Sequence, residues 1–225
     1  ACIVEPIAGS TGVLVPPEGY LERLRAICDA HGILLIFDEV ICGFGRTGEA
    51  FGAQSFGVTP DLMTMAKALT NGTIPMGAVA LADEIYETII GAGAEGSVEF
   101  FHGYTYSGHP AATAAGLATL DLYRDEDLFA RGQALSAGFL ERVFALQDLD
   151  AVSDIRGYGL LAAVEMAPGQ VPGQRGHRLL KRCWEAGLVL RMTGDTAILA
   201  PALIAAEDDL DEMVATLRAE IPLCL

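Results

Sequence analysis

Two periodicities of apolar residues divide the chain into predicted strands and helices. Short continuous apolar runs are typical of strands covered on both faces. These runs are 33–37, 62–65 and 76–81, and the chain itself opens, at residues 1–5, as though already inside a strand. An apolar residue at every third or fourth position predicts helices, and the stretches with this spacing are 20–31, 83–90, 111–123 and 128–146. This alternation is typical of a mainly parallel α/β sheet.

The residues at the ends of these stretches support the helix assignment. Gly32 is expected to stop the first helix, and Asp83 is expected to be the N-cap of the helix at 83–90. Pro110 suits the first position of the helix that follows it, because its missing N–H has no partner there in any case.

After about residue 150 the pattern changes. The predicted strands are 159–166, 188–191 and 197–199, the predicted helices are 177–185 and 207–220, and a loop rich in Pro and Gly is expected at 168–176. Strands interleaved with helices in this way predict a smaller α+β domain behind the mainly parallel α/β one.

Composition narrows the class of protein. The chain has 225 residues, 52% of them hydrophobic, and a formal charge of −16, which argues against a nucleic-acid-binding surface. No apolar run reaches the length of a membrane span. Five cysteines without a C-x-x-C pair favour neither a disulfide framework nor a zinc site, so a reducing, cytoplasmic location is expected. The chain shows no signal peptide and no initiator Met, so we expect a fragment.

Two charged residues stand in apolar surroundings. Asp38 ends the run 33–37, and open α/β sheets present groups to ligands at the carboxyl ends of their strands. Lys67 lies among apolar residues, where burial would lower the pKa of its amine and suit it to Schiff-base chemistry. Together they indicate pyridoxal phosphate, which needs an amine for its aldehyde and an acid for its pyridinium nitrogen. The alternatives are a turn-capping Asp38 and a Lys67 whose amine reaches solvent.

Two other motifs favour structural interpretations. Residues 91–96 match G-x-G-x-x-G, but a predicted helix precedes them and residues 97–101 do not look helical, so a mobile loop is favoured over a dinucleotide site. His102 and His109 are too far apart for a helical metal pair and no cluster of cysteines or carboxylates joins them, so no metal is expected.

Two segments leave alternatives open. Residues 103–110 gather hydroxyl and N–H groups ahead of a predicted helix, which suits a phosphate, although helix capping by Ser107 or His109 is the simpler interpretation. Arg191 needs an anionic partner, because an arginine in an apolar segment cannot lose its charge. That partner is either Asp195 or the carboxylate of a substrate, and the pattern alone favours Asp195.

Taken in order, these segments resemble the class III aminotransferases of the fold-type I pyridoxal-phosphate enzymes. The matching segments are 4–6, 35–40, 43–48, 60–61 with Lys67, 70–72, 75–77 and 102–110, and residues 99–104 are also similar to the ω-amino acid–pyruvate branch of the family. The resemblance runs nearly end to end, and the order and spacing of so many segments make it specific. It implies an α/β fold in which residues 1–125 are the C-terminal part of the large, mainly parallel cofactor-binding domain and 126–225 the small α+β C-terminal domain.

The resemblance also implies roles for individual residues. Lys67 would hold pyridoxal 5'-phosphate as a Schiff base and then move the proton between substrate and cofactor. Asp38 would pair with the pyridinium nitrogen, and Val40 would pack against one face of the ring. Thr105 would reach the cofactor phosphate of the neighbouring subunit, which implies a homodimer or a larger oligomer.

Substrate choice follows from two positions. Leu199 stands where many relatives that use 2-oxoglutarate carry an arginine. Arg191, followed by Gly194 and Asp195, is similar to the carboxylate-binding arginine of the ω-amino acid–pyruvate branch, typified by β-alanine–pyruvate aminotransferase. The implied function is transfer of an amino group from an ω-amino acid or amine to pyruvate. The alternatives are another class III enzyme, such as an aminomutase or a decarboxylase, and a non-catalytic truncated module.

Three features depart from the family pattern. Ala202 replaces a usual second proline, and Ala68 a frequent glycine. Family members are also about twice this long, so we expect the 225-residue chain alone to be inactive.

Overall fold

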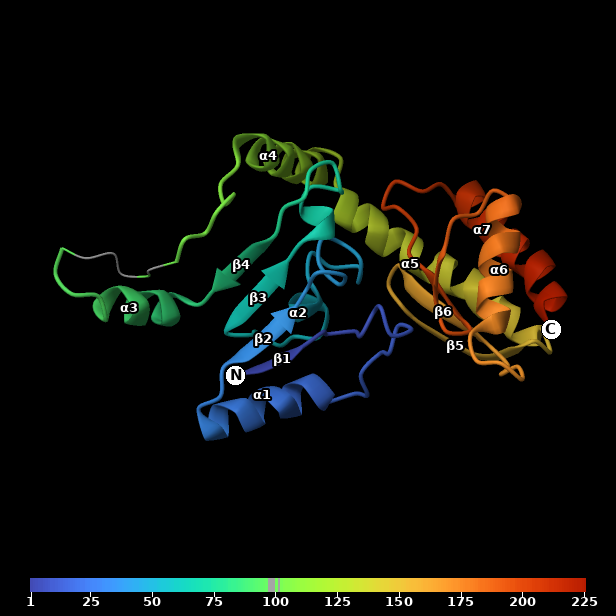
Figure 1. The fold of residues 1–225 in the computed structure, drawn as a ribbon, viewed down its shortest axis with the longest axis horizontal. Coiled ribbons are helices and arrows are strands. Elements are labelled where there is room, and N and C mark those ends of the chain that lie inside the picture. Colours follow the sequence, from blue (N-terminus) through green and yellow to red (C-terminus); the bar gives the residue numbers. More distant parts are fainter. Residues whose placement is uncertain (97–99, 101) are drawn as a thin grey trace.

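A four-stranded sheet organises the first part of the chain in the computed structural model, which describes residues 1–96, 100 and 102–225 (Figure 1). The strands are β1 (Cys2–Val4), β2 (Leu35–Asp38), β3 (Leu62–Met65) and β4 (Ala78–Leu81), in that order across the sheet. The first three are parallel and β4 is antiparallel to β3. The sheet is therefore mainly parallel, as predicted.

Helix α1 (Tyr20–His31) connects β1 to β2 and lies along the sheet (Figure 1). It ends at Gly32, whose φ of 61° is the left-handed conformation that glycine adopts without strain. Leu21 and Cys28 of α1 are buried in one apolar cluster with Leu35 and Phe37 of β2. The cluster covers one face of β2, while Ile36, on the other face, is only half-buried.

Three boundaries in this part differ from the sequence prediction. β2 and β4 each start two residues later than their apolar runs, because only the later residues have ladder partners. Ala82, not Asp83, is the N-cap of α3 (Asp83–Gly91), and the Asp83 carboxylate stands in the first turn. A carboxylate there still interacts favourably with the helix dipole. The prediction for 97–101 falls mostly on residues 97–99 and 101, which lie outside the described residues.

A second, antiparallel sheet organises the last third of the chain. Its strands are β5 (Val152–Tyr158), β6 (Leu161–Met166), β7 (Arg191–Thr193) and β8 (Thr196–Leu199), in the order β5-β6-β8-β7. The strand predicted at 159–166 begins only at Leu161, because Gly159 turns the chain with a φ of 60°. A side chain there would stand 2.6 Å from the backbone carbon of Thr47.

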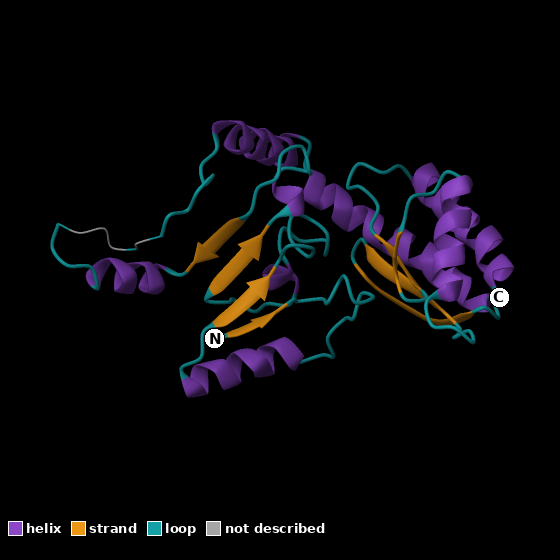
Figure 2. Cartoon of the chain, in the orientation of Figure 1, coloured by secondary structure: helices purple, strands orange, loops and turns teal. Residues whose placement is uncertain are grey.

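The four remaining longer helices are α4 (Pro110–Asp125), α5 (Leu128–Phe144), α6 (Gln174–Glu185) and α7 (Glu207–Glu220). Of these, α5, α6 and α7 pack on the second sheet, and α4 lies beside the first sheet and leads into α5 (Figure 2). Pro110 is the first residue of α4, as predicted. α5 ends earlier than predicted and continues as a 3₁₀ turn, Ala145–Asp148, and α6 begins inside the expected loop 168–176.

The remaining short elements are helix α2 (Gly52–Ser55) and the 3₁₀ turns Lys67–Leu69 and Ile221–Cys224. The largest apolar cluster lies between the second sheet and α5, α6 and α7. Its fully buried members include Phe139, Leu146, Val164, Leu179 and Leu217. Within the described ranges, no helix is both long enough and apolar enough to cross a membrane.

Candidate functional site

The ends of β2 and β3 bring the two predicted chemical groups to one edge of the first sheet. Asp38 is the last residue of β2 and is paired in register with Thr64 of β3. β3 ends one residue later, and Lys67 follows in a 3₁₀ turn with a φ of 44°. The predicted burial of Lys67 is wrong for this chain: the side chain follows the strand instead of lying within it, and it is exposed.

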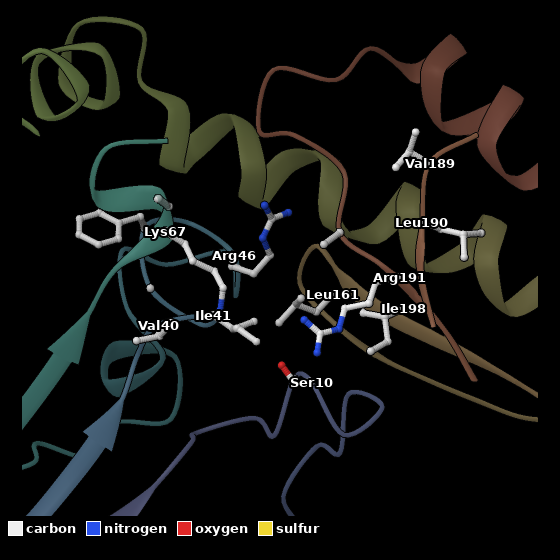
Figure 3. A pocket seen from close by; sticks show the side chains of 15 residues that line it. Ser10, Val40, Ile41, Arg46, Lys67, Leu161, Val189, Leu190, Arg191 and Ile198 are labelled. Atoms are coloured by element: carbon white, nitrogen blue, oxygen red, sulfur yellow. The ribbon is translucent and has the colours of Figure 1, made fainter. Parts of the chain in front are cut away.

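Lys67 and Arg191 line one cavity of about 440 Å3, although they come from different sheets (Figure 3). Val40 and Ile41, from the segment after β2, lie on the same wall as Lys67 (Figure 3). Three of the fifteen lining residues are cations, the third being Arg46, and none is acidic. In a chain with a formal charge of −16, this composition suits anionic ligands.

The Asp38 carboxylate is held in place by its own strand end. Its Oδ1 accepts the N–H of Val40 at 3.0 Å. Within the described part of the chain, its Oδ2 has no hydrogen-bond or ion-pair partner. An oriented carboxylate with one free oxygen and a primary amine on the neighbouring strand end are the groups that pyridoxal phosphate requires, so these residues fit the cofactor.

Glu39, the next residue, is fully buried, and its hydrogen bonds connect the end of β2 to β3 and to α2. Its Oε2 accepts the N–H of Gly52 at 2.9 Å, and its Oε1 accepts the N–H of Ala53 at 2.7 Å. Its own N–H donates to the carbonyl of Thr64 at 2.9 Å. Burial raises the pKa of Glu39 above its ordinary value, although the two backbone donors oppose this effect.

The ion pair that the pattern favoured between Arg191 and Asp195 does not form. Both oxygens of Asp195 are used elsewhere, since they accept the N–H groups of Gly173 at 3.0 Å and Gly176 at 2.8 Å. Arg191 is exposed and, among the described residues, has no hydrogen-bond or ion-pair partner. It is also the first residue of β7, so the predicted strand at 188–191 overlaps the observed one only there.

Arg46 and Tyr123 are two residues at the site that the sequence did not single out. Arg46 donates from its Nη1 to the carbonyls of Leu160, at 3.3 Å, and Pro201, and burial lowers the pKa of its guanidinium. Tyr123 donates from its hydroxyl to the carbonyl of Ala68 at 2.7 Å, directly after Lys67. The only available signal was an arginine inside the glycine-rich segment 43–48.

Thr105 lies apart from this cavity, in the exposed segment that precedes α4. It lines a separate hollow between β4 and α4, together with Tyr104 and His109. His109 occupies the N-cap position of α4 without a side-chain hydrogen bond, and Ser107 makes no side-chain bond there either, so the predicted capping interaction is not observed. A phosphate-binding role for this segment stays a prediction.

Comparison with known proteins gives a consistent picture. The family described as aminotransferase class-III matches residues 1–221. The omega-aminotransferase of Caulobacter vibrioides is 54% identical over 219 residues, which are 97% of this chain and 50% of that protein. The beta-alanine–pyruvate aminotransferase of Pseudomonas aeruginosa is 50% identical over 215 residues, which are 95% of this chain and 48% of that protein. The chain thus spans about half the length of these curated relatives.

Solved structures agree in fold. An (S)-enantioselective omega-transaminase from Thermomicrobium roseum superposes with a TM-score of 0.92 at 39% identity, covering 99% of this chain and 50% of that one. A PLP-bound amine transaminase from an uncultivated Pseudomonas species superposes with a TM-score of 0.91 at 38% identity, covering 100% of this chain and 52% of that one. The α/β fold predicted for the chain, that of fold-type I transferases, is therefore confirmed.

Proposed function

This chain belongs to the class III aminotransferase family, and we propose that its protein transfers an amino group from an ω-amino acid or amine to pyruvate with pyridoxal 5'-phosphate as cofactor. The observation that carries the proposal is the shared cavity, in which the amine of Lys67 and the guanidinium of Arg191 face the same space (Figure 3). One group suits a cofactor aldehyde and the other suits a substrate carboxylate.

The residues of the first sheet would hold the cofactor. When bound, pyridoxal phosphate supplies an aldehyde and a ring that accepts the electron pair released at the substrate carbon. Lys67 provides the amine that retains the cofactor and afterwards the base that moves the substrate proton. Asp38, whose Oδ1 accepts the N–H of Val40, would pair with the ring nitrogen, and the apolar side chain of Val40, which lines the cavity, would pack against the ring.

The free guanidinium of Arg191 supports a substrate with a carboxylate. With Asp195 engaged at the start of α6, the charge of Arg191 is left for a ligand. Leu199 stands where the family resemblance places an arginine in relatives that use 2-oxoglutarate, so this chain lacks a charge for a second carboxylate there, which supports a monocarboxylate such as pyruvate as the acceptor. The beta-alanine–pyruvate aminotransferase of Pseudomonas aeruginosa is named for pyruvate, which supports the same choice.

Thr105 is assigned to the cofactor phosphate of a neighbouring subunit in a homodimer. Its distance from the Lys67 cavity along the fold and the exposure of Tyr104 and Tyr106 beside it support an intersubunit role.

We assign residues 1–125 to the large domain and 126–225 to the small one. The five free cysteines support a reducing, cytoplasmic location.

The chain has only two lysines, Lys67 and Lys181, so trapping the cofactor tests the site cleanly. We expect borohydride reduction with pyridoxal phosphate, followed by peptide mass mapping, to place the adduct on Lys67 and not on Lys181, which is exposed on α6. In the full-length protein that contains this chain, Lys67→Ala should abolish both the adduct on this segment and the formation of alanine from β-alanine and pyruvate, whereas Lys181→Ala should change neither.

Each contrary result has a definite meaning. Equal labelling of both lysines, or alanine formation by Lys67→Ala, would refute the assignment of Lys67. Turnover of β-alanine without any keto acid would instead identify an aminomutase or a decarboxylase. Supplying ¹⁵N-labelled β-alanine together with ¹³C-labelled pyruvate separates the reaction classes, because only a transaminase forms alanine that carries both labels.

A further inference from the structure

Ser10 stands on a turn that the fold holds rigidly beside the cavity. The N–H groups of Gly12 and Val13 both donate to the carbonyl of Gly9 at 3.1 Å, and the N–H of Gly9 donates to Oε2 of Glu5 at 2.9 Å. A side chain at position 9 would meet Cγ2 of Ile41 at 2.8 Å, so the turn lies directly against the segment that follows β2.

The same turn is fastened to the second sheet. Arg156 of β5 donates from its Nε to the carbonyl of Gly12 at 3.0 Å, and its Nη1 is held by Glu165 at 2.7 Å. A side chain at position 12 would lie 3.5 Å from Cγ2 of Thr196 and 3.8 Å from Cγ2 of Thr193. The turn of Ser10 therefore lies against the β7–β8 hairpin, on which Arg191 stands.

The Ser10 hydroxyl is free and faces the cavity. Its oxygen points toward the guanidinium of Arg191, and both residues line the same space (Figure 3). Within the part of the chain that the structure describes, the hydroxyl makes no hydrogen bond. Thr11, its neighbour, differs on both counts, because its hydroxyl donates to the carbonyl of Ala8 at 3.2 Å and it does not line the cavity.

We propose that Ser10 is a substrate-binding residue whose hydroxyl, together with Arg191, forms a two-point subsite for the carboxylate of the amino donor or keto acid; this deepens the proposed function and rests on it. An ionised carboxylate has about four acceptor positions, of which a guanidinium fork occupies two. The hydroxyl of Ser10, on the turn beside the β7–β8 hairpin, takes a third. The hydroxyl is neutral, and the turn that carries it is held in place by hydrogen bonds. It therefore determines where the carboxylate binds without adding charge to the cavity.

Binding of an unreactive carboxylate tests this without turnover. Calorimetric titration of the holoenzyme with propionate should give an affinity about tenfold lower for Ser10→Ala, which loses one hydrogen bond to a charged group. Propanamide, which has a similar shape and no charge, should bind both proteins alike. Thr11→Ala is the matched control and should bind propionate like the wild type, and Ser10→Thr, which keeps the hydroxyl, should bind propionate better than Ser10→Ala.

Arg191→Ala separates the two proposals. If it weakens propionate binding and Ser10→Ala does not, the role of Ser10 is refuted while the proposed function stands. If neither variant changes propionate binding, or the wild type does not bind propionate, the carboxylate site itself is refuted. In kinetics, Ser10→Ala should raise the KM for β-alanine and leave that for butylamine unchanged; equal effects on both substrates would contradict a carboxylate contact. Circular dichroism and thermal unfolding of each variant identify losses that come from misfolding.

Discussion

Glu39 illustrates at the scale of one residue how chemistry and folding are coupled at this site. It lies between Asp38 and Val40, both assigned to the cofactor, yet its own side chain turns inward and is fully buried. Its hydrogen bonds join the end of β2 to β3 and to the start of α2. The residue thus fixes the backbone from which its two neighbours extend.

The raised pKa of Glu39 predicts a pH-dependent stability. The pKa of Glu39 in the folded state lies above the ordinary value of 4.5. At pH values between these two, the folded protein therefore keeps a proton that the unfolded chain has released. The stabilisation is complete below that ordinary value and is lost as the pH rises through the folded-state pKa. Glutamine does not titrate, so the free energy of unfolding of the wild type minus that of Glu39→Gln should decrease from pH 4.5 toward pH 7. Urea unfolding at several pH values measures this difference, and a constant or increasing difference would contradict the prediction.

Residues at strand ends were predictable from the sequence, and residues defined by distant contacts were not. Asp38 and Lys67 stood out because each follows an apolar run, and position alone signals a ligand-facing edge. Ser10 and Arg46 carried no such signal, because what makes them relevant is contact with segments more than a hundred residues away. The predicted pairing of Arg191 with Asp195 was wrong for the same reason. Asp195 instead accepts N–H groups at the start of α6, and the sequence around Asp195 gives no sign of those partners.

At the scale of elements, a single carboxylate, that of Asp195, anchors the β7–β8 hairpin to helix α6. Asp195 stands in the turn between the two strands and fastens it to the start of α6 through Gly173 and Gly176. The apolar run before β7 predicted too early a strand, because β8 offers ladder partners only from Arg191 onward. β5 was missed entirely, since polar residues in Val152–Tyr158 interrupt its apolar pattern.

Removing this carboxylate should loosen the hairpin. Asp195→Ala leaves the two N–H groups without their acceptor and should lower the free energy of unfolding by about 1–2 kcal/mol, as loss of a helix cap does. Hydrogen exchange at Gly176 should accelerate, and Asp195→Asn, which keeps one acceptor, should lose less. Glu212→Ala is the control, because this exposed carboxylate on α7 has no partner among the described residues. Equal stability of Asp195→Ala and the control would refute the anchoring role.

At the scale of the whole molecule, Arg46 connects the two sheets across the cavity. It follows β2 in sequence, yet its Nη1 donates to the carbonyls of Leu160, just before β6, and Pro201, just after β8, at one end of the second sheet. The backbone joins in, since the N–H of Leu160 donates to the carbonyl of Arg46 at 2.9 Å. These contacts hold the segment after β2, on the Lys67 side of the cavity, against the second sheet, which carries Arg191.

Arg46→Lys tests this connection. A lysine keeps the charge, but its side chain is one atom shorter than the path to Nη1 of arginine, so its ammonium cannot reach both carbonyls and the free energy of unfolding should fall by about 1–3 kcal/mol. Propionate and pyridoxal phosphate should both bind more weakly, because the two walls of the cavity, one from each sheet, are no longer held together by Arg46. Arg23→Lys, at an exposed position on α1 without a described side-chain partner, should leave all three quantities unchanged. Wild-type stability in Arg46→Lys would show that the two sheets are held together by other contacts.

The backbone of Lys67 carries one more consequence. A φ of 44° is a conformation in which glycine would be at ease and lysine is not. Such a residue costs the fold about 1–3 kcal/mol. Stability and the chemistry of the proposed function therefore oppose each other at this position, because glycine would relieve the backbone and remove the amine. We expect Lys67→Gly to raise the free energy of unfolding in urea while it abolishes the borohydride-trapped adduct.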